Sequence, residues 1–170
     1  MKVAIAALAV AIAVAGVFAG LYLTKTPTTK TLVVRTAPCG EQRLFGHIRS
    51  LARKGGRYEM RFDPAVYTAG VTANTAAAED GVIPHGTAMP DDNYVSDESH
   101  RAYLYFVPSS TPVRVLTPKS YVDGTPITVA QLAQLVAGKT PVKLFEPLDS
   151  GFWMRVHVDT ACSLQQQFHP

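Results

Sequence analysis

Residues 44–62, LFGHIRSLARKGGRYEMRF, decide the fold of this chain. The paired glycines Gly55 and Gly56 supply the positive φ that a tight connection between two strands needs. After the glycines, tyrosine, methionine and phenylalanine alternate with charged residues, which is the period of a sheet with one buried face. The stretch therefore predicts a β-hairpin with strands over 44–50 and 57–62.

Further strands are expected downstream of the hairpin, because short runs of β-branched and aromatic residues alternate there with turn residues. These runs cover residues 103–107, 113–116, 152–158 and 161–168. Between them, residues 129–137 predict a helix, since Thr128 and Gln131 form a capping box and Gly138 follows as a stop.

Two shorter helical pieces are expected after the hairpin. Asp63 and Pro64 read as an N-cap followed by proline at the first helical position, which predicts a short helix or turn. Residues 73–80 predict a second piece, capped by Thr72 and ended by Gly81.

Short strands with a few short helices indicate a mainly β fold of the α+β class. We expect a small antiparallel, partly open barrel or sandwich, and an OB-like barrel is one candidate. This single extracytoplasmic domain is expected over residues 42–170. Residues 24–41, which include the threonine-rich stretch TKTPTTKT, predict an extended tether in front of it.

Residues 1–23 predict a transmembrane or signal helix. The run VAIAALAVAIAVAGVFAGLYL has 21 residues without charge, and at about 1.5 Å per residue it would span a hydrocarbon core of about 30 Å. Lys2 in front and Ala19 near the end also fit a cleaved secretory signal. Both alternatives export the domain, either as a single-pass protein of the cell membrane or as a secreted protein.

The chain has two cysteines, Cys39 and Cys162, near opposite ends of the expected domain. An even count in an oxidising compartment favours a structural disulfide bond between them. A reactive role is the alternative, but neither cysteine has a CxxC neighbour.

Composition and missing motifs exclude several classes of function. A net charge of +3 gives no argument for a nucleic-acid partner. GxSxG, HExxH, GxGxxG and phosphate-loop patterns are absent. The sequence therefore predicts no cofactor, no metal and no catalytic residue.

Basic residues concentrate on the hairpin and form the first candidate binding site. They could contact lipid headgroups, an anionic envelope polymer or an envelope protein. The alternative is that they are exposed strand charges that discourage edge pairing. The residues are Arg49, Arg53, Lys54, Arg57 and Arg61.

The polar stretch 81–100 predicts a long loop, and its acidic part is the second candidate site. Its members Asp91, Asp92, Asn93 and Tyr94 offer oxygen ligands of the kind Ca²⁺ prefers, but the EF-hand pattern is missing. Solvated turn chemistry is the alternative interpretation.

Histidines and the single tryptophan are weaker candidates. His157 and Asp159 lie close together in the sequence, and His47 and His100 would approach them if a barrel closes. Single histidines on a polar strand face are more often ordinary surface residues. Trp153 is expected to point outward, either as a contact surface or to cover a helix.

The sequence also resembles a family of exported bacterial proteins with a DPA…G…A…AA.EDG core and a downstream Pro-Asn-Asp-Tyr-like element. The matching residues are 63–65, Gly70, Ala73, 76–77 and 79–81, and the later element here reads Pro-Asp-Asp-Asn-Tyr over 90–94. The resemblance implies a bacterial, extracytoplasmic protein and brings no established activity.

The leading hypothesis is an envelope-associated binding domain that uses the basic hairpin and the long loop. The alternative is a cell-envelope hydrolase or other enzyme whose loop carboxylates act as acid and base. Convergence of these carboxylates in a concave pocket would favour the enzyme. They are Asp63, Glu79, Asp80, Asp91 and Asp92.

Overall fold

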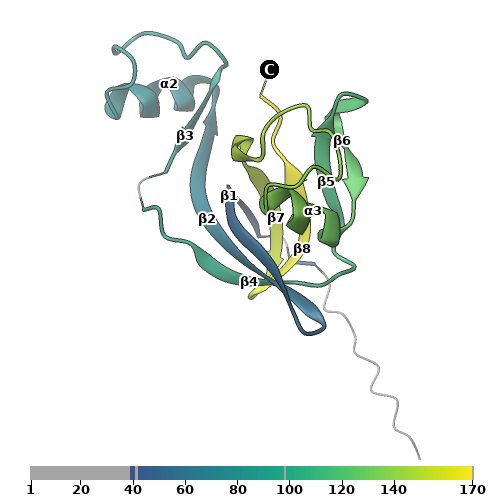
Figure 1. Cartoon of the computed structure of the whole chain (residues 1–170). Coiled ribbons are helices and arrows are strands. Elements are labelled where there is room, and N and C mark those ends of the chain that lie inside the picture. The colour runs from purple at the N-terminus through teal and green to yellow at the C-terminus, as the bar shows by residue number, and fades with distance from the viewer. Residues whose placement is uncertain (1–38, 41, 98, 170) are drawn as a thin grey trace, which may run out of the picture. The chain divides into compact units, whose positions relative to one another are not determined.

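The hairpin predicted at Gly55 and Gly56 is the longest pair of strands in the structure (Figure 1). The structure is a computed structural model that describes residues 39–40, 42–97 and 99–169. Strands β1 (Arg43–Lys54) and β2 (Arg57–Ala69) pair antiparallel, and Gly55 has a φ of 61° in the turn. The hairpin prediction is confirmed, and both strands are longer than expected.

Five strands close into a barrel. β2 pairs with β4 (Tyr103–Val107), and β1 pairs with β7 (Phe152–His157). β7 pairs with β8 (Thr160–Gln166), which meets β4 in parallel and completes the ring. The strand order β1-β2-β4-β8-β7 is that of an OB-fold barrel. The prediction of a mainly β, OB-like fold is therefore confirmed.

The barrel interior is filled from every strand and covered by helix α3 (Val129–Val136). In α3, Thr128 and Gln131 form the predicted capping box, and Gly138 follows with a φ of 77°. Val129 and Leu132 are fully buried against the barrel residues, which explains why this helix has one apolar face. The largest core side chains are Phe62, Phe152, Met60, Leu132, Met154 and Leu164.

Three further strands extend the described sheet. β5 (Val113–Thr117) continues it in parallel beyond β8, and β6 (Ser120–Ile127) pairs with β5. β3 (Asn93–Ser96) pairs with the end of β2, and helix α2 (Gly70–Glu79) lies between them. β2, α2 and β3 form a lobe that projects from the barrel (Figure 1). β3 and β6 were not predicted, because turn residues interrupt both sequences.

The helix predicted at Asp63 and Pro64 is wrong, since both residues lie within β2. The Asp63 carboxylate accepts hydrogen bonds from Arg49 instead of capping backbone N–H groups. The second helical piece exists, but it starts at Gly70 after an N-cap at Ala69, so Thr72 does not cap it. A short 3₁₀ helix, η1 (Leu148–Ser150), precedes β7.

The expected membrane or signal segment 1–23 lies outside the described residues, as does the tether 24–41 except Cys39 and Gly40. In the part of the chain that the structure describes, no helix has the length and apolar character needed to cross a membrane.

The close approach of β1 and β2 at Gly46 generates a stability prediction. A Cβ atom at residue 46 would overlap the Asp63 carbonyl oxygen and lie 2.8 Å from Pro64 Cα, whereas a Cβ at Gly56 meets no atom within 4 Å. Gly46→Ala should lower the free energy of unfolding by about 1–3 kcal/mol. Gly56→Ala should change it by less than about 0.5 kcal/mol. Chemical denaturation measures both, and equal effects would contradict the close packing.

Candidate functional site

The outer surface of β1, β2 and β4 carries most of the predicted basic residues. Tyr58, Met60 and Phe62 are buried in the barrel, so the residues that alternate with them on β2 face outward. Arg57 and Arg61 are exposed there, and exposed Lys54 pairs with Arg57 at the hairpin tip. Arg53 is also exposed, but it pairs with the buried Tyr58 and so belongs to the other side of the hairpin. We call Lys54, Arg57 and Arg61, together with Leu104 and Phe106 of β4, the basic face.

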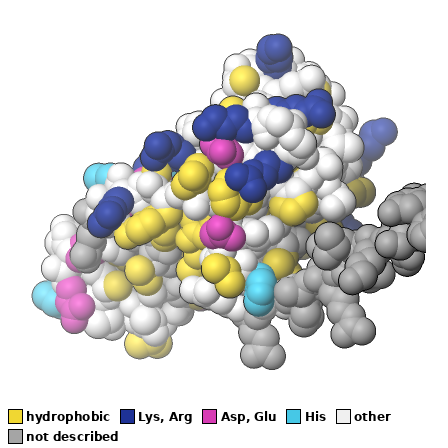
Figure 2. All heavy atoms as spheres, turned by 90° about the horizontal axis from the view of Figure 1, so that it is seen from below, with side chains coloured by type: hydrophobic (Ala, Val, Ile, Leu, Met, Phe, Trp, Pro, Cys, Tyr) yellow, Lys and Arg dark blue, Asp and Glu magenta, His cyan; other side chains and the backbone are white. Residues whose placement is uncertain are grey.

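Apolar side chains of β4 lie beside the basic residues. Arg61 pairs with Leu104, which is 47% exposed, and Glu59 pairs with Phe106. The Arg57 guanidinium carbon lies 3.7 Å from the centroid of the Phe106 ring, which is a cation–π contact. Seen from below, Lys and Arg side chains gather around hydrophobic ones with few acidic groups between them (Figure 2). The strand was predicted over 103–107, but its place beside the basic residues was not, because YLYFV has no polar residue to indicate which side faces outward.

Most of the positive charge on the basic face is not neutralised. Lys54 Nζ forms an ion pair with Glu59 Oε2 at 2.8 Å. Within the described residues, no carboxylate lies within ion-pair distance of Arg53, Arg57 or Arg61. The Arg53 Nε atom donates to the Gly55 carbonyl, which holds that side chain over the turn. The face can therefore offer the two guanidinium groups of Arg57 and Arg61 to an anion.

Arg49, the fifth predicted basic residue, has a structural role. The pairing of β1 with β2 shifts between Ile48 and Ser50, so Arg49 is the extra residue of a β-bulge. Its guanidinium donates to Asp63 Oδ2 through Nε at 2.8 Å and Nη2 at 2.6 Å, and Nη2 also lies 3.4 Å from Asp97 Oδ2. Arg49 is therefore not available to a ligand of the basic face.

Asp63 is fully buried, although it belongs to the outer side of β2. Asp97, in the connection between β3 and β4, lies close to it and contacts His100 Nδ1 at 3.2 Å. The Oδ1 atoms of Asp63 and Asp97 are buried and have no hydrogen-bond partner among the described residues. A buried hydrogen-bond acceptor without a partner costs about 1–3 kcal/mol of folding free energy. The two unpaired oxygens therefore destabilise this cluster.

The acidic loop is far from the basic face. Asp92 accepts from the Gly70 amide and Asn93 donates to the Asp91 carbonyl, so the loop closes the end of the lobe. The Tyr94 hydroxyl donates to Asp80 Oδ2 at 2.8 Å. The hairpin tip and this loop lie at opposite ends of β2 (Figure 1). They are separated by up to about 40 Å of strand, so they do not form one site.

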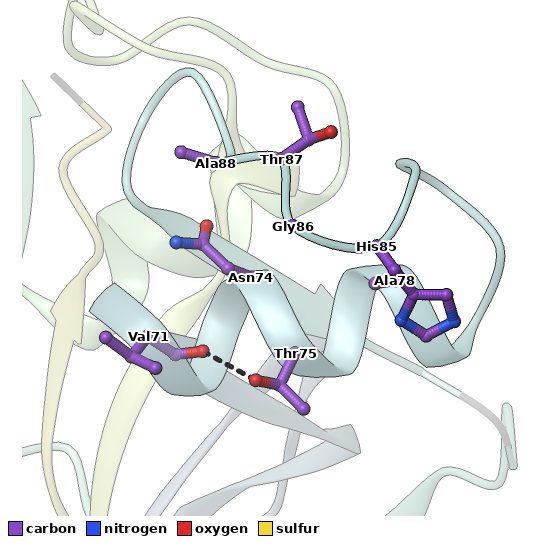
Figure 3. Close-up of a pocket in the computed structure, with 8 residues that line it drawn as sticks. All are labelled: Val71, Asn74, Thr75, Ala78, His85, Gly86, Thr87 and Ala88. Carbon is purple, nitrogen blue, oxygen red and sulfur yellow. Dashed lines mark hydrogen bonds between the residues drawn. The ribbon is translucent and has the colours of Figure 1, made fainter.

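A cavity of about 290 Å³ lies between α2 and the loop that follows it (Figure 3). Asn74 Oδ1 accepts from the Met89 amide, and Thr75 Oγ1 donates to the Val71 carbonyl, so both polar groups already have partners. Among the described residues, no carboxylate lines the cavity. The lining residues are Val71, Asn74, Thr75, Ala78, His85, Gly86, Thr87 and Ala88.

In the described structure, the five predicted carboxylates do not line that cavity. The candidate histidines His47, His100 and His157 do not line it either. Asp63 lies in the barrel sheet, whereas the other four carboxylates are exposed on the lobe. Asp63, Asp97 and His100 are the donors that come within 4.8 Å of one another in the described part. His47 and His157 do not belong to that group.

Trp153 is half-buried in an aromatic cluster on the barrel wall. Its ring lies 5.2 Å from Phe45 and 5.6 Å from Tyr67, and burial raises the pKa of Tyr67. The indole N–H donates to Gln167 Oε1 at 2.6 Å. Trp153 thus covers the wall and has its polar group satisfied.

Cys39 and Cys162 lie next to each other, although the structure contains them as free thiols. Gly40 allows the entering segment to run against β7, since a Cβ there would lie 2.6 Å from the Val156 carbonyl oxygen. The hydrogen bond with the Cys162 thiol, followed by desolvation, raises the pKa of Cys39.

Comparison with protein-family models, curated proteins and solved structures gave no match. The functional argument therefore depends on the geometry of the domain.

The Arg49–Asp63 contact predicts a large stability effect. Arg49→Ala would leave the buried Asp63 charge without its cation, and since Arg49 is half exposed we expect a loss of about 1–3 kcal/mol. Arg61→Ala, a matched change two positions from Asp63, should cost less than about 0.5 kcal/mol. Urea unfolding of both variants is the test, and a neutral Arg49→Ala would show that the contact contributes nothing.

Proposed function

We propose that this domain binds an anionic, chain-like ligand on the basic face, outside the cytoplasmic membrane. The observation that carries the proposal is that Arg57 and Arg61 lack carboxylate partners in the described part and lie beside the apolar side chains Phe106 and Leu104. Guanidinium groups bind phosphate and carboxylate with two parallel hydrogen bonds.

The position of the basic face within the fold supports a chain-like ligand. In OB-folds, the second and third barrel strands, with the loops after strands one and four, bind oligonucleotides and oligosaccharides. Here those strands are β2 and β4, and the loops are the Gly55–Gly56 turn and the turn at Val158, which is exposed. Backbone contact between Phe106 and Asp159 brings the second loop to the same face.

An envelope polymer with phosphate or carboxylate groups fits this face and the proposed location. The apolar segment 3–23 and the resemblance to exported bacterial proteins support the proposed export. Nucleic acid is not expected in that compartment. The membrane contact of the chain would be the N-terminal segment, either retained as an anchor or removed as a signal.

The hydrolase alternative receives no support from the geometry. General acid–base catalysis needs two groups within reach of one substrate bond. Asp63 is enclosed in the sheet, and Glu79, Asp80, Asp91 and Asp92 are exposed at the far end of β2. We therefore favour binding over catalysis.

The binding proposal predicts a charge-specific loss of affinity. The purified full-length chain should bind a fluorescent heparin dodecasaccharide, a surrogate anionic polymer, and affinity should fall as salt rises. Arg57→Ala/Arg61→Ala should weaken binding roughly tenfold or more. Lys119→Ala/Lys139→Ala removes the same charge outside the basic face and should change affinity less than about twofold.

Two further probes identify the ligand class. Neutral dextran should not bind, and vesicles containing phosphatidylglycerol should bind more weakly than the dodecasaccharide. Equal losses in the two double variants would mean that net charge alone drives binding, which contradicts the proposed face.

We also propose that Cys39 and Cys162 form a disulfide bond in the exported protein. Their adjacent thiols and the oxidising compartment support this pairing. The bond would tie the segment that enters the domain to β8.

The disulfide proposal predicts no reactive thiol in denatured, unreduced protein. Replacing both cysteines by serine should lower the melting temperature by roughly 5–15 °C and retain the fold, because the core does not include either sulfur. Two titratable thiols in protein recovered from outside the cytoplasm would contradict the pairing.

A further inference from the structure

A cluster formed by β2 and the connection from β3 to β4 has the composition of a metal site. Asp63 contributes from β2, and Asp97 and His100 contribute from the connection, with one donor atom of each lying within 4.8 Å of the others. Asp63 is 0% exposed. Its Oδ1 atom and that of Asp97 are buried without a hydrogen-bond partner in the described part of the chain.

Arg49 does not neutralise the whole negative charge of this cluster. Its single positive charge faces the Oδ2 atoms of both Asp63 and Asp97. Two carboxylates therefore face a single guanidinium. Buried carboxylate oxygens normally have partners. A cation bound by the two carboxylates would compensate the remaining negative charge and give a partner to oxygens that have none.

We propose that Asp63, Asp97 and His100 bind a divalent transition-metal ion, with Zn²⁺ as the best match. An imidazole nitrogen with two carboxylates suits zinc, whereas Ca²⁺ and Mg²⁺ prefer oxygen ligands alone. Zinc lies about 2.0–2.2 Å from such ligands, so the donors must approach to about 3–4 Å. His100 can supply this movement, because its side chain is 73% exposed.

The ion would join β2 to the connection that leads into β4. Since β4 carries Leu104 and Phe106, the metal would fix the strand that forms one border of the basic face. This inference does not depend on the proposed ligand.

Isothermal titration of the full-length, untagged, chelator-treated chain with ZnCl₂ tests the site. We expect one Zn²⁺ per chain, a rise in melting temperature with zinc, and no heat with CaCl₂. His100→Ala and Asp97→Asn should each weaken Zn²⁺ binding at least about tenfold. Both changes lie on the connection, so they avoid the folding risk of replacing Asp63.

His157→Ala is the matched control, since His157 is also an exposed histidine and lies at the end of β7. It should leave zinc affinity unchanged. Absence of zinc binding at about 1 mM, or binding that His100→Ala does not weaken, would overturn the site and leave an ion-pair cluster only.

Discussion

Closure of the barrel through the contact between β4 and β8 is the constraint on which the other features depend. The Phe106 amide donates to the Asp159 carbonyl at 2.8 Å, and Phe106 pairs with Thr160 in the one parallel step of the ring. Closure pairs each of the five barrel strands on both sides and gives them a common interior. It also fixes which side of each strand faces water. Phe106 therefore takes part in both closure and the basic face, where Arg57 lies over its ring.

The arginines of the hairpin divide into one that makes structural contacts and others that remain exposed. The bulge directs Arg49 to Asp63, and this contact links β1, β2 and the connection that contains Asp97. On the regular part of the hairpin, alternation keeps Arg57 and Arg61 in solvent. One irregularity in strand pairing thus separates a structural arginine from arginines that can contact a ligand.

Local patterns predicted much of the fold. The glycine pair, the Thr128–Gln131 capping box and the alternation in β7 act over short distances, so the sequence shows them directly. The prediction of a helix start at Asp63-Pro64 was wrong because the Asp63 carboxylate pairs with Arg49, fourteen residues earlier in the chain. Of the candidate site, the sequence predicted only the basic residues of the hairpin. Leu104 and Phe106 join it through pairing with β2, and Asp97 and His100 reach Asp63 through tertiary structure, which no spacing in the sequence indicates.

The central claim is that the outer side of β1, β2 and β4 is the ligand-binding surface. Amide chemical-shift mapping by NMR on the ¹⁵N-labelled full-length chain, titrated with heparin dodecasaccharide, tests it directly. The account predicts that the largest shifts fall on residues 53–61 and 103–107 and in the turn after β7, with β5, β6 and α3 unchanged. Shifts concentrated on β5, β6 or the cavity beside α2, or no shifts at saturating ligand, would contradict it.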